Sequence, residues 1–337
     1  MQVNRNELID VLKKIQPALS TKGIVEEMNC FMFRGSMVYG YNDKLCIGHR
    51  SPVEFSGFSV PANEFVKIAQ GMADELVDLE YDQEKQLLSL SGKSVKAKLK
   101  TIQSTLIESI PDASENAWQA LPSNFMEGIQ LCLFSASKDM SVSFLNCLWV
   151  KEDTIVSSDN FRISRFQMKE TIADPFLLPL SAAIELVSIG GFTEYALNEG
   201  WVFFRTAADD IIFCARLVEA DYPDTSALFA IDAVDEFEMP TAIKEGIVVC
   251  DVLSDHDAID KRIQLSLMGT EVICKGEGGK GWVEQSVSGA KVPEGLTFDV
   301  NPVFLACVLG HSTSAQVAEG KLIFRSGTFT HIMALPE

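Results

Sequence analysis

The chain has 337 residues, of which 47% are hydrophobic, so it is globular and long enough for two or three domains with full cores. Its 47 acidic residues outnumber its 28 lysines and arginines, which gives a net charge of −19. That charge argues against a protein that holds nucleic acid by electrostatic attraction, because such proteins are usually basic on the binding face. No apolar run approaches the roughly 18 residues that a membrane-spanning helix needs. The polar start MQVNRNELID is not typical of a signal peptide.

The first stretch of the chain begins with an amphipathic helix. Asn4 or Asn6 can cap it, and Pro17 limits it to about Gln16. Its apolar side recurs at helical spacing and consists of Leu8, Leu12, Ile15 and Leu19. Three strands follow, around NCFMFRG, SMVYGYN and KLCIGHR, and a second helix starts at Pro61 and ends at Gly71.

The end of this stretch predicts a hairpin, LVDLEY and QLLSLSG, followed by the alternating segment KSVKAKLK. In that segment Lys96, Lys98 and Lys100 fall on one face, and Val95 and Leu99 on the other. A lysine row of this kind can meet phosphate, but it more often guards the edge of a sheet. We favour the sheet edge.

The second stretch follows a polar, turn-prone linker, PDASENAWQA, at Pro111 to Ala120. Its first helix starts at Pro122 and buries a stripe that consists of Phe125, Ile129, Cys132, Leu133 and Ala136. Its second helix lies in LPLSAAIELVSIGG and ends at the pair Gly190-Gly191. The strands YALNEG, WVFFRTA and IIFCARLVEA complete the sheet.

The third stretch follows an acidic linker at Ile231 to Pro240. A helix starts at Thr241, and we expect four of its residues to face inward, namely Ile243, Ile247, Val248 and Val252. Glycine-punctuated strands follow, and Asn301-Pro302 starts another helix. The chain therefore predicts an α+β fold of three similar domains, 1–115, 116–234 and 235–337, each with two helices among several strands.

Motifs for catalysis and for metal binding are missing from the sequence. The segment GEGGKGW has glycines and a lysine but no Ser/Thr and no following helix, so it predicts a hairpin turn. The four histidines lie far apart, and an exposed loop explains Asp255-His256-Asp257 better than a metal site does. No serine lies in a G-x-S-x-G elbow. We therefore expect a binding scaffold with no cofactor, no metal and no catalytic residues.

The eight cysteines form no C-x-x-C pair, and most have apolar neighbours, as in LCLF and VVCDV. This pattern favours buried, reduced thiols in a cytoplasmic protein over disulfides or a zinc site. The eight are Cys30, Cys46, Cys132, Cys147, Cys214, Cys250, Cys274 and Cys307.

Three separated segments carry a family resemblance. They read Ser-Asp-Asn-Phe-Arg-Ile at Ser158 to Ile163, Leu-Val-Glu-Ala-Asp-Tyr-Pro-Asp at Leu217 to Asp224, and Ile-Met-Ala-Leu-Pro-Glu at the end of the chain. The first is a tight loop between two strands, as Asp and Asn favour. Together they resemble the bacterial DNA polymerase III beta subunit, the sliding clamp, whose loop reads Thr-Asp-Gly-His-Arg-Leu and whose tail reads Val-Met-Pro-Met-Arg-Leu. The departures, Asn160-Phe161 for Gly-His and an altered tail, indicate a divergent clamp with its own peptide preference, such as a phage clamp.

The resemblance implies a hydrophobic pocket between the second and third domains that accepts a short peptide from partner proteins. Apolar walls would bury the peptide's side chains, and a few polar groups would orient it. The matched pocket positions are Leu145, Ser158, Asn160, Phe161, Arg162, Ile163, Pro223, Leu228, Met333, Ala334 and Leu335. From the residues alone, Leu145, Ile163 and Leu228 are equally well explained as ordinary core.

The resemblance also implies weak, sequence-independent contacts with the phosphates of double-stranded DNA. The candidate positions are Lys13, Lys14, Lys22, Lys67, Lys138, Phe144, Arg205 and Lys244. For each lysine, a solvated surface group is the favoured interpretation from the residues alone, and Glu127 and Glu185 fall on the same expected helix faces.

The resemblance thus implies the DNA clamp fold, closed into a ring by a head-to-tail homodimer. Such a ring would tether a replicative DNA polymerase in the cytoplasm, be opened by a clamp loader and bind other clamp-motif proteins, without catalysis of its own. Enclosure would hold an acidic ring on DNA without strong attraction. Two alternatives stay open: a non-encircling regulator that captures clamp-binding peptides, and an enzyme with a site assembled from distant residues.

Overall fold

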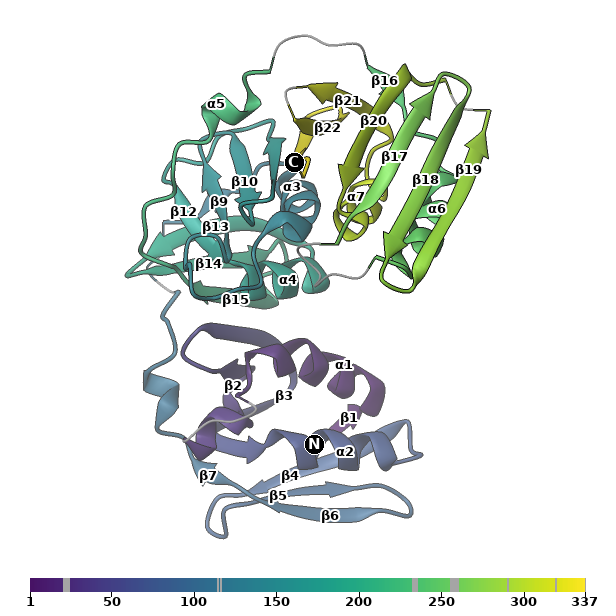
Figure 1. Ribbon diagram of the computed structural model, residues 1–337. Helices are drawn as coiled ribbons and strands as arrows, with labels where there is room; N and C mark the ends of the chain where they lie inside the picture. Colours follow the sequence, from purple (N-terminus) through teal and green to yellow (C-terminus); the bar gives the residue numbers. More distant parts are fainter. Residues whose placement is uncertain are drawn as a thin grey trace. The chain divides into compact units, whose positions relative to one another are not determined.

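The computed structural model describes residues 1–20, 25–113, 115, 117–231, 236–254, 261–289, 291–318 and 320–336 (Figure 1). They form two compact units: Met1–Leu121 with Ser181–Glu219, and Pro122–Leu180 with Ala220–Glu337. The division into domains 1–115, 116–234 and 235–337 stays a prediction. Among the described helices, none combines the length and the apolar character needed to cross a membrane.

The first unit begins with the predicted amphipathic helix, α1 (Arg5–Ile15). The Asn4 side chain accepts hydrogen bonds from the backbone N–H groups of Asn6 and Glu7, at 2.9 and 3.2 Å, so Asn4 is the cap. The buried face of α1 packs against strand β3 (Leu45–Pro61) and helix α2 (Ala62–Gly71). A 3-10 turn at Gln16–Ala18 follows, and the prediction that Pro17 limits the helix is confirmed.

The unit contains a four-stranded antiparallel sheet with the strand order β1-β4-β5-β6. The strands are β1 (Gln2–Asn4), β4 (Leu76–Asp82), β5 (Leu87–Ser91) and β6 (Lys96–Lys100). In β6, at the end of this order, Lys96, Lys98 and Lys100 are exposed and Leu99 is buried. The predicted lysine-guarded sheet edge is confirmed.

A seven-stranded antiparallel sheet joins early and late parts of the first unit. The strands are β2 (Cys30–Tyr41), β3 (Leu45–Pro61), β7 (Ile102–Gln103), β8 (Gln119–Ala120), β13 (Phe192–Asn198), β14 (Trp201–Thr206) and β15 (Ile211–Arg216). The two parts meet where β3 pairs with β15, with Cys46 directly opposite Cys214. A 3-10 turn at Leu106–Glu108 follows β7, and its residues Leu106 and Ile107, together with Ile110, Ala113 and Trp118, pack over one face of this sheet.

The second unit contains an eight-stranded antiparallel sheet that is built in the same way. The strands are β9 (Cys147–Lys151), β10 (Thr154–Ser158), β11 (Arg162–Gln167), β12 (Phe176–Pro179), β16 (Phe237–Glu238), β21 (Ser314–Ala318), β22 (Lys321–Ser326) and β23 (Phe329–Ala334). Its two halves meet where β11 pairs with β23, with Ile163 opposite Ile332.

Helix α3 (Phe125–Cys132) packs against β10 and β11 and continues into a 3-10 turn, Leu133–Ser135. Gly128 permits the close approach, because a Cβ there would lie 2.8 Å from the Ile155 side chain and closer still to Phe166. The second predicted helix is α4 (Leu180–Ile189), and it ends, as expected, at Gly190 and Gly191, which have positive φ.

The second unit also contains a four-stranded sheet of order β19-β18-β17-β20, with helices α6 (Ile243–Asp251) and α7 (Pro302–Val308). The strands are β17 (Ile263–Met268), β18 (Glu271–Gly278), β19 (Gly281–Ser288) and β20 (Glu294–Val300). Strands β18 and β19 pair as a hairpin across GEGGKGW, as predicted. The cap of α7 is Asn301, whose side chain accepts from the N–H groups of Val303 and Phe304.

One prediction for α6 is wrong. Val248 and Val252 are 68% and 77% exposed, whereas Ile243, Ile247 and Cys250 are buried. The buried face of the helix packs against β18 and the edge strand β19, so the two valines lie on its opposite face. This helix therefore carries two apolar stripes, one in the core and one facing solvent.

All eight cysteines are free thiols, and seven of them are buried, as expected. Among the described residues there is no group of three or more His, Cys, Asp and Glu side chains that could hold a metal ion. The Asp255-His256-Asp257 triplet lies outside the described residues.

Candidate peptide-binding site

The eight-stranded sheet has two different faces at its junction, because side chains alternate along each strand. Ser164 and its strand partner His331 lie on the face toward α3, which we call the helix face. Ile163 and its partner Ile332 lie on the opposite face, against the segment 222–231 that leads to the third stretch. We call this second face the linker face.

An apolar cluster lies on the linker face directly at the junction. Its buried members are Val156, Ile163, Ile323 and Ile332, and its partly buried members are Trp149, Tyr222, Phe229, Ile231 and Ala318. Tyr222 stacks on Trp149 with ring centroids 5.0 Å apart, and meets Phe144 edge-on at 5.7 Å. The cluster therefore combines branched side chains from four strands with aromatic rings from the linker.

Tyr222 gives this cluster a polar group. Burial raises the pKa of its phenol, so the hydroxyl stays protonated at neutral pH. That hydroxyl has no hydrogen-bond partner within the described part of the chain. The hydroxyl is enclosed in the cluster, and a buried donor without a partner lowers the stability of the fold.

The loop between β10 and β11 is held by its own hydrogen bonds. One carboxylate oxygen of Asp159 accepts from the N–H groups of Phe161 and Arg162, at 3.1 and 3.0 Å. The hydroxyl of Ser158 donates to the Arg162 carbonyl at 2.8 Å, and Asn160 has a φ of +73°. The predicted tight loop is confirmed, and Asn tolerates its positive φ better than most residues do.

Arg162 extends from this loop onto the helix face. Its Nε donates to Asp159 at 2.9 Å, and its guanidinium lies 4.1 Å from the Phe304 ring and 5.6 Å from the Phe134 ring. Both partners of the ion pair are largely covered, with side chains 11% and 14% exposed. This combination of an ion pair and ring stacking fixes the end of β11 to α7.

His331 is fully buried beside Arg162 on the helix face. Its Nδ1 lies 2.9 Å from the Ser164 hydroxyl, which is 2.6 Å from the hydroxyl of Ser135. Burial, and then the charge of Arg162, lower the pKa of His331, so the ring is neutral at pH 7. Because the group is enclosed, this Ser–His arrangement joins β11, β23 and the end of α3 and is not accessible to a substrate.

The predicted pocket residues divide between the two faces. Ile163 is buried on the linker face. Leu228 lies in the short helix α5 (Ser226–Phe229), next to the cluster residue Phe229, and its side chain is 44% exposed. Pro223 is exposed in the same linker. On the helix face lie Arg162 and Met333, and Met333 is 1% exposed in the core beneath α6 and α7.

The remaining predicted residues lie at the end of the sheet or beside it. The Ala334 N–H donates to the Phe161 carbonyl at 2.9 Å, which brings the tail to the loop. Phe161 is 44% exposed, with its ring 6.5 Å from that of Phe304. Leu335 packs against the core under α7. Leu145 is buried in the turn before β9.

Sequence reasoning missed several members of the cluster, namely Ile332, Ile323, Tyr222 and Phe229. Ile332 and Phe229 are each one position away from a residue that was chosen, Met333 and Leu228. In a strand, a shift of one residue moves a side chain to the other face, and only the observed register fixes the choice. The alternating pattern His-Ile-Met-Ala of the tail was the available signal.

The predicted DNA-contact residues have different environments. Five lysines are exposed: Lys13 and Lys14 on α1, Lys67 on α2, Lys138 after α3, and Lys244 on α6. Arg205 in β14 is paired with Glu194 at 2.6 Å and with Asp209 at 3.9 Å, so its charge is already neutralised. Phe144 packs against Tyr222 in the linker-face cluster. Lys22 lies outside the described residues.

Comparison by sequence gives no relative of this chain. No family model matches it, and no curated protein matches it.

Comparison of the fold gives full-length matches. A putative DNA polymerase III beta subunit from Eubacterium rectale superposes with a TM-score of 0.84 at 16% identity, covering 100% of this chain and 99% of the other. The DNA polymerase III beta subunit of Thermotoga maritima gives 0.83 at 18% identity, covering 100% and 98%. The Helicobacter pylori beta clamp bound to a DNA ligase peptide gives 0.83 at 16% identity, covering 100% and 99%. The chain therefore has the fold of the DNA sliding clamps, as predicted.

Proposed function

We propose that this protein is a DNA sliding clamp, a ring that encircles duplex DNA, tethers a DNA polymerase and thereby confers processivity. The observation that carries the proposal is the fold, which matches sliding clamps over the whole chain. The sequence motifs at the loop, at the linker and in the tail support it independently. The protein has no catalytic role in this proposal, and it needs no cofactor.

We infer three domains from the order of the elements. Each begins with a short strand followed by a helix: β1 and α1, β8 and α3, β16 and α6. In each, a later strand leads directly into a second helix: β3 into α2, β12 into α4, and β20 into α7. Such a repeat is typical of duplicated domains.

The two four-stranded sheets support ring closure by a second copy. Neighbouring repeats share the seven-stranded and the eight-stranded sheets, whereas the four-stranded sheets stop at the edge strands β6 and β19. The edge β6 exposes Lys96, Lys98 and Lys100, and the edge β19 exposes Glu284. The lysines of β6 and Glu284 of β19 have opposite charges and can pair between copies, so a head-to-tail homodimer closes the ring.

Helix α6 adds an apolar surface beside the edge strand β19. Val248, Val249 and Val252 are 68%, 42% and 77% exposed on a helix that packs against β19. Exposed apolar side chains in a row are typical of protein interfaces. We include these valines in the contact between copies.

Enclosure then explains how an acidic protein stays on DNA. With a net charge of −19, attraction to phosphates is weak, but a closed ring requires none. Contacts from the exposed Lys13, Lys14, Lys67, Lys138 and Lys244 would be sequence-independent and sensitive to salt. Lys22 and Phe144 stay in the proposal as inferred from the motifs, whereas Arg205 is the weakest candidate because it is already paired.

Partner proteins would bind at the linker-face cluster and at the adjoining loop and tail. The H. pylori clamp of the same fold is described as bound to a DNA ligase peptide. Here, the cluster offers apolar and aromatic side chains. Burying a leucine or phenylalanine of a peptide would contribute roughly 25 cal/mol per Å². The proposed partners are a polymerase, a clamp loader and other clamp-motif proteins, in the cytoplasm of a bacterium or of a phage-infected host.

The ring is tested by two measurements on the purified protein. Light scattering should give twice the mass of one chain. After loading onto nicked circular DNA, the protein should stay bound in high salt and be released when a restriction enzyme linearises the circle. A monomer that is retained equally on both DNA forms would contradict the ring. If that monomer still bound partner peptides, the alternative of a non-encircling regulator would replace the proposed sliding clamp.

Peptide binding is tested separately by titrating a bacterial clamp-motif peptide and following the indole signal of Trp149 in a ¹H–¹⁵N spectrum. Leu228→Asp should weaken binding by about ten-fold, because a charge replaces an exposed apolar contact of the site. Met140→Asp is the matched control, since Met140 is 68% exposed in the same unit and outside the cluster. Equal binding by the two variants would remove the linker face from the proposal.

A further inference from the structure

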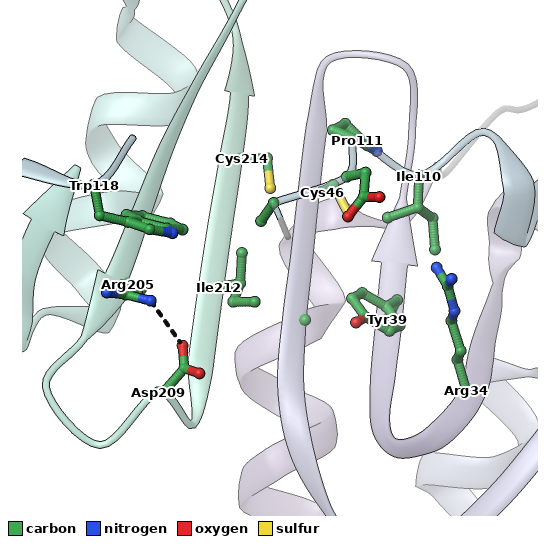
Figure 2. Close-up of a pocket in the computed structure, with 13 residues that line it drawn as sticks. Arg34, Tyr39, Cys46, Ile110, Pro111, Trp118, Arg205, Asp209, Ile212 and Cys214 are labelled. Carbon is green, nitrogen blue, oxygen red and sulfur yellow. Dashed lines mark ion pairs between the residues drawn. The ribbon is translucent and has the colours of Figure 1, made fainter. Parts of the chain in front are cut away.

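The seven-stranded sheet also has a linker face, which is the face covered by Ile110 and Trp118, and a pocket lies there. Its volume is about 400 Å³, and all of its lining residues belong to the first unit. Figure 2 shows Tyr39 and Ile110 on one side of it, and Trp118 and Ile212 on the other. A volume of this size is typical of pockets that bind small ligands or single peptide side chains.

The position of this pocket repeats that of the peptide-binding site. In both joined sheets a linker covers the face where two strands from distant parts of the chain meet. The central pair is Cys46 and Cys214 in the seven-stranded sheet, where Ile163 and Ile332 form the pair in the other. Two small thiols leave more space between sheet and linker than two isoleucines do. Both cysteines line the pocket.

Gly48 shapes the floor of the pocket. A Cβ at this position would lie 2.5 Å from the Tyr39 ring, so the ring lies flat over the glycine. The opposite wall is held by Arg205, whose guanidinium lies 4.3 Å from the Trp118 ring and is paired with Glu194 and Asp209. Two aromatic rings are thus fixed on either side of the cavity before any ligand arrives.

Arg34 supplies a charge that is not neutralised. It lines the pocket from β2, and Figure 2 shows its guanidinium extending toward Ile110. Within the described part of the chain it forms no ion pair and no side-chain hydrogen bond, although Asp112 also lines the pocket. Arginine binds a carboxylate through two parallel hydrogen bonds. The Tyr39 hydroxyl is a second donor, because burial raises the pKa of that phenol to about 12.

We propose that this pocket is a second peptide-binding site, which takes an aromatic or aliphatic side chain next to a carboxylate. The side chain enters between Tyr39 and Trp118, and the carboxylate binds Arg34. The inference goes beyond the proposed clamp function, and it does not depend on ring closure.

The test follows the indole signals of the four tryptophans in a ¹H–¹⁵N spectrum of the full chain. The probe is the peptide acetyl-Gly-Asp-Phe-Gly-amide, and its isostere with Asn in place of Asp is the neutral control. The signal of Trp118 is assigned with Trp118→Phe. We expect the Asp probe to shift Trp118 and leave Trp149 unchanged, with the Asn probe about ten-fold weaker, because a charge-assisted pair is lost. No shift of Trp118 at millimolar probe would overturn the proposal.

Three variants make the assignment specific. Arg34→Gln should remove the preference for Asp over Asn, and Arg216→Gln should retain it, because Arg216 lies over Trp201 outside the pocket. Gly48→Ala should weaken both probes equally by moving the Tyr39 ring into the cavity. If Arg34→Gln kept the preference, the carboxylate site would be wrong. A clamp-motif peptide that shifts Trp149 in the same sample tests the proposed function independently.

Discussion

Two kinds of sheet in this molecule differ in how their edges are used. The seven-stranded and eight-stranded sheets join distant parts of the chain through the strand pairs β3–β15 and β11–β23. In the described part of the chain, the two four-stranded sheets have no such continuation, and strands β6 and β19 lie at the ends of their strand orders. The joined sheets carry linkers over one face, and the others carry exposed charges along an edge.

The difference indicates which regions of the chain bind which partners. At a joined sheet the two junction strands pair their backbones with each other, so a partner there contacts mainly side chains. At an edge strand the backbone is itself a binding surface, and another copy can extend the sheet. We therefore expect variants at the edges to change the assembly, and variants at the junctions to change ligand binding and stability.

The largest effect is expected for Val248→Asp with Val252→Asp on α6. Both side chains are more than two-thirds exposed in the single chain, so folding should be unaffected. In the dimer each valine would contribute on the order of 1 kcal/mol by burial, and a buried, unpaired Asp costs more. The dimer should weaken by at least about a hundred-fold, measured by sedimentation. Val303→Asp, on the exposed side of α7, is the control and should stay dimeric.

A smaller effect is expected from reversing the charge of the basic edge with Lys96→Glu and Lys98→Glu. Like charges would then face Glu284 of the second copy, and the dimer should weaken by about ten-fold at low salt. Lys44→Glu with Lys169→Glu changes the net charge equally at exposed positions elsewhere and should have no effect. Adding Glu284→Lys to the edge variant should restore part of the affinity; without that rescue, β19 is not the partner edge.

The sequence predicted local structure well and pairing poorly. The caps, the breaks at Pro17 and Gly190, and the alternation of the lysine strand depend on neighbouring residues, and all of them are observed. The junctions β3–β15 and β11–β23 join residues more than 150 positions apart. No local pattern specifies such a contact, so the clusters on the linker faces could not be derived from periodicity.

The candidate site illustrates the same limit at the level of single residues. The tail residues were chosen by resemblance, and the strand register then separates them: Ile332 lies on the linker face and Met333 in the core. On α6, apolar residues occupy both faces, so periodicity alone could not decide that Ile247 is buried and Val248 exposed. Register and helix rotation are set by tertiary packing.

A pH effect on stability is expected from His331, which is fully buried on the helix face of the eight-stranded sheet. Its pKa is lowered in the folded state, so between that value and about 6.5 the unfolded chain binds the proton and the folded chain does not. The contribution of neutral His331 to the free energy of unfolding is therefore complete above about pH 6.5. It decreases as the pH falls, by at most about 1.4 kcal/mol per pH unit. His331→Gln should flatten the decrease of unfolding free energy between pH 7 and pH 5 in urea titrations. His311→Gln, at an exposed position, should flatten it less, and an unchanged slope in His331→Gln would contradict the assignment.

The smallest effect is expected for Arg162→Lys at the end of β11. Lysine keeps the charge opposite Asp159 but cannot stack its planar group on Phe304 and Phe134, a contact worth about 0.5–1 kcal/mol. The loop Ser158–Arg162 should loosen, and the affinity for a clamp-motif peptide should fall by about three-fold in calorimetric titration. Arg216→Lys removes a similar contact with Trp201 in the first unit and should leave that affinity unchanged. If both variants bind equally, Arg162 only supports the fold, and the linker face alone carries the peptide site.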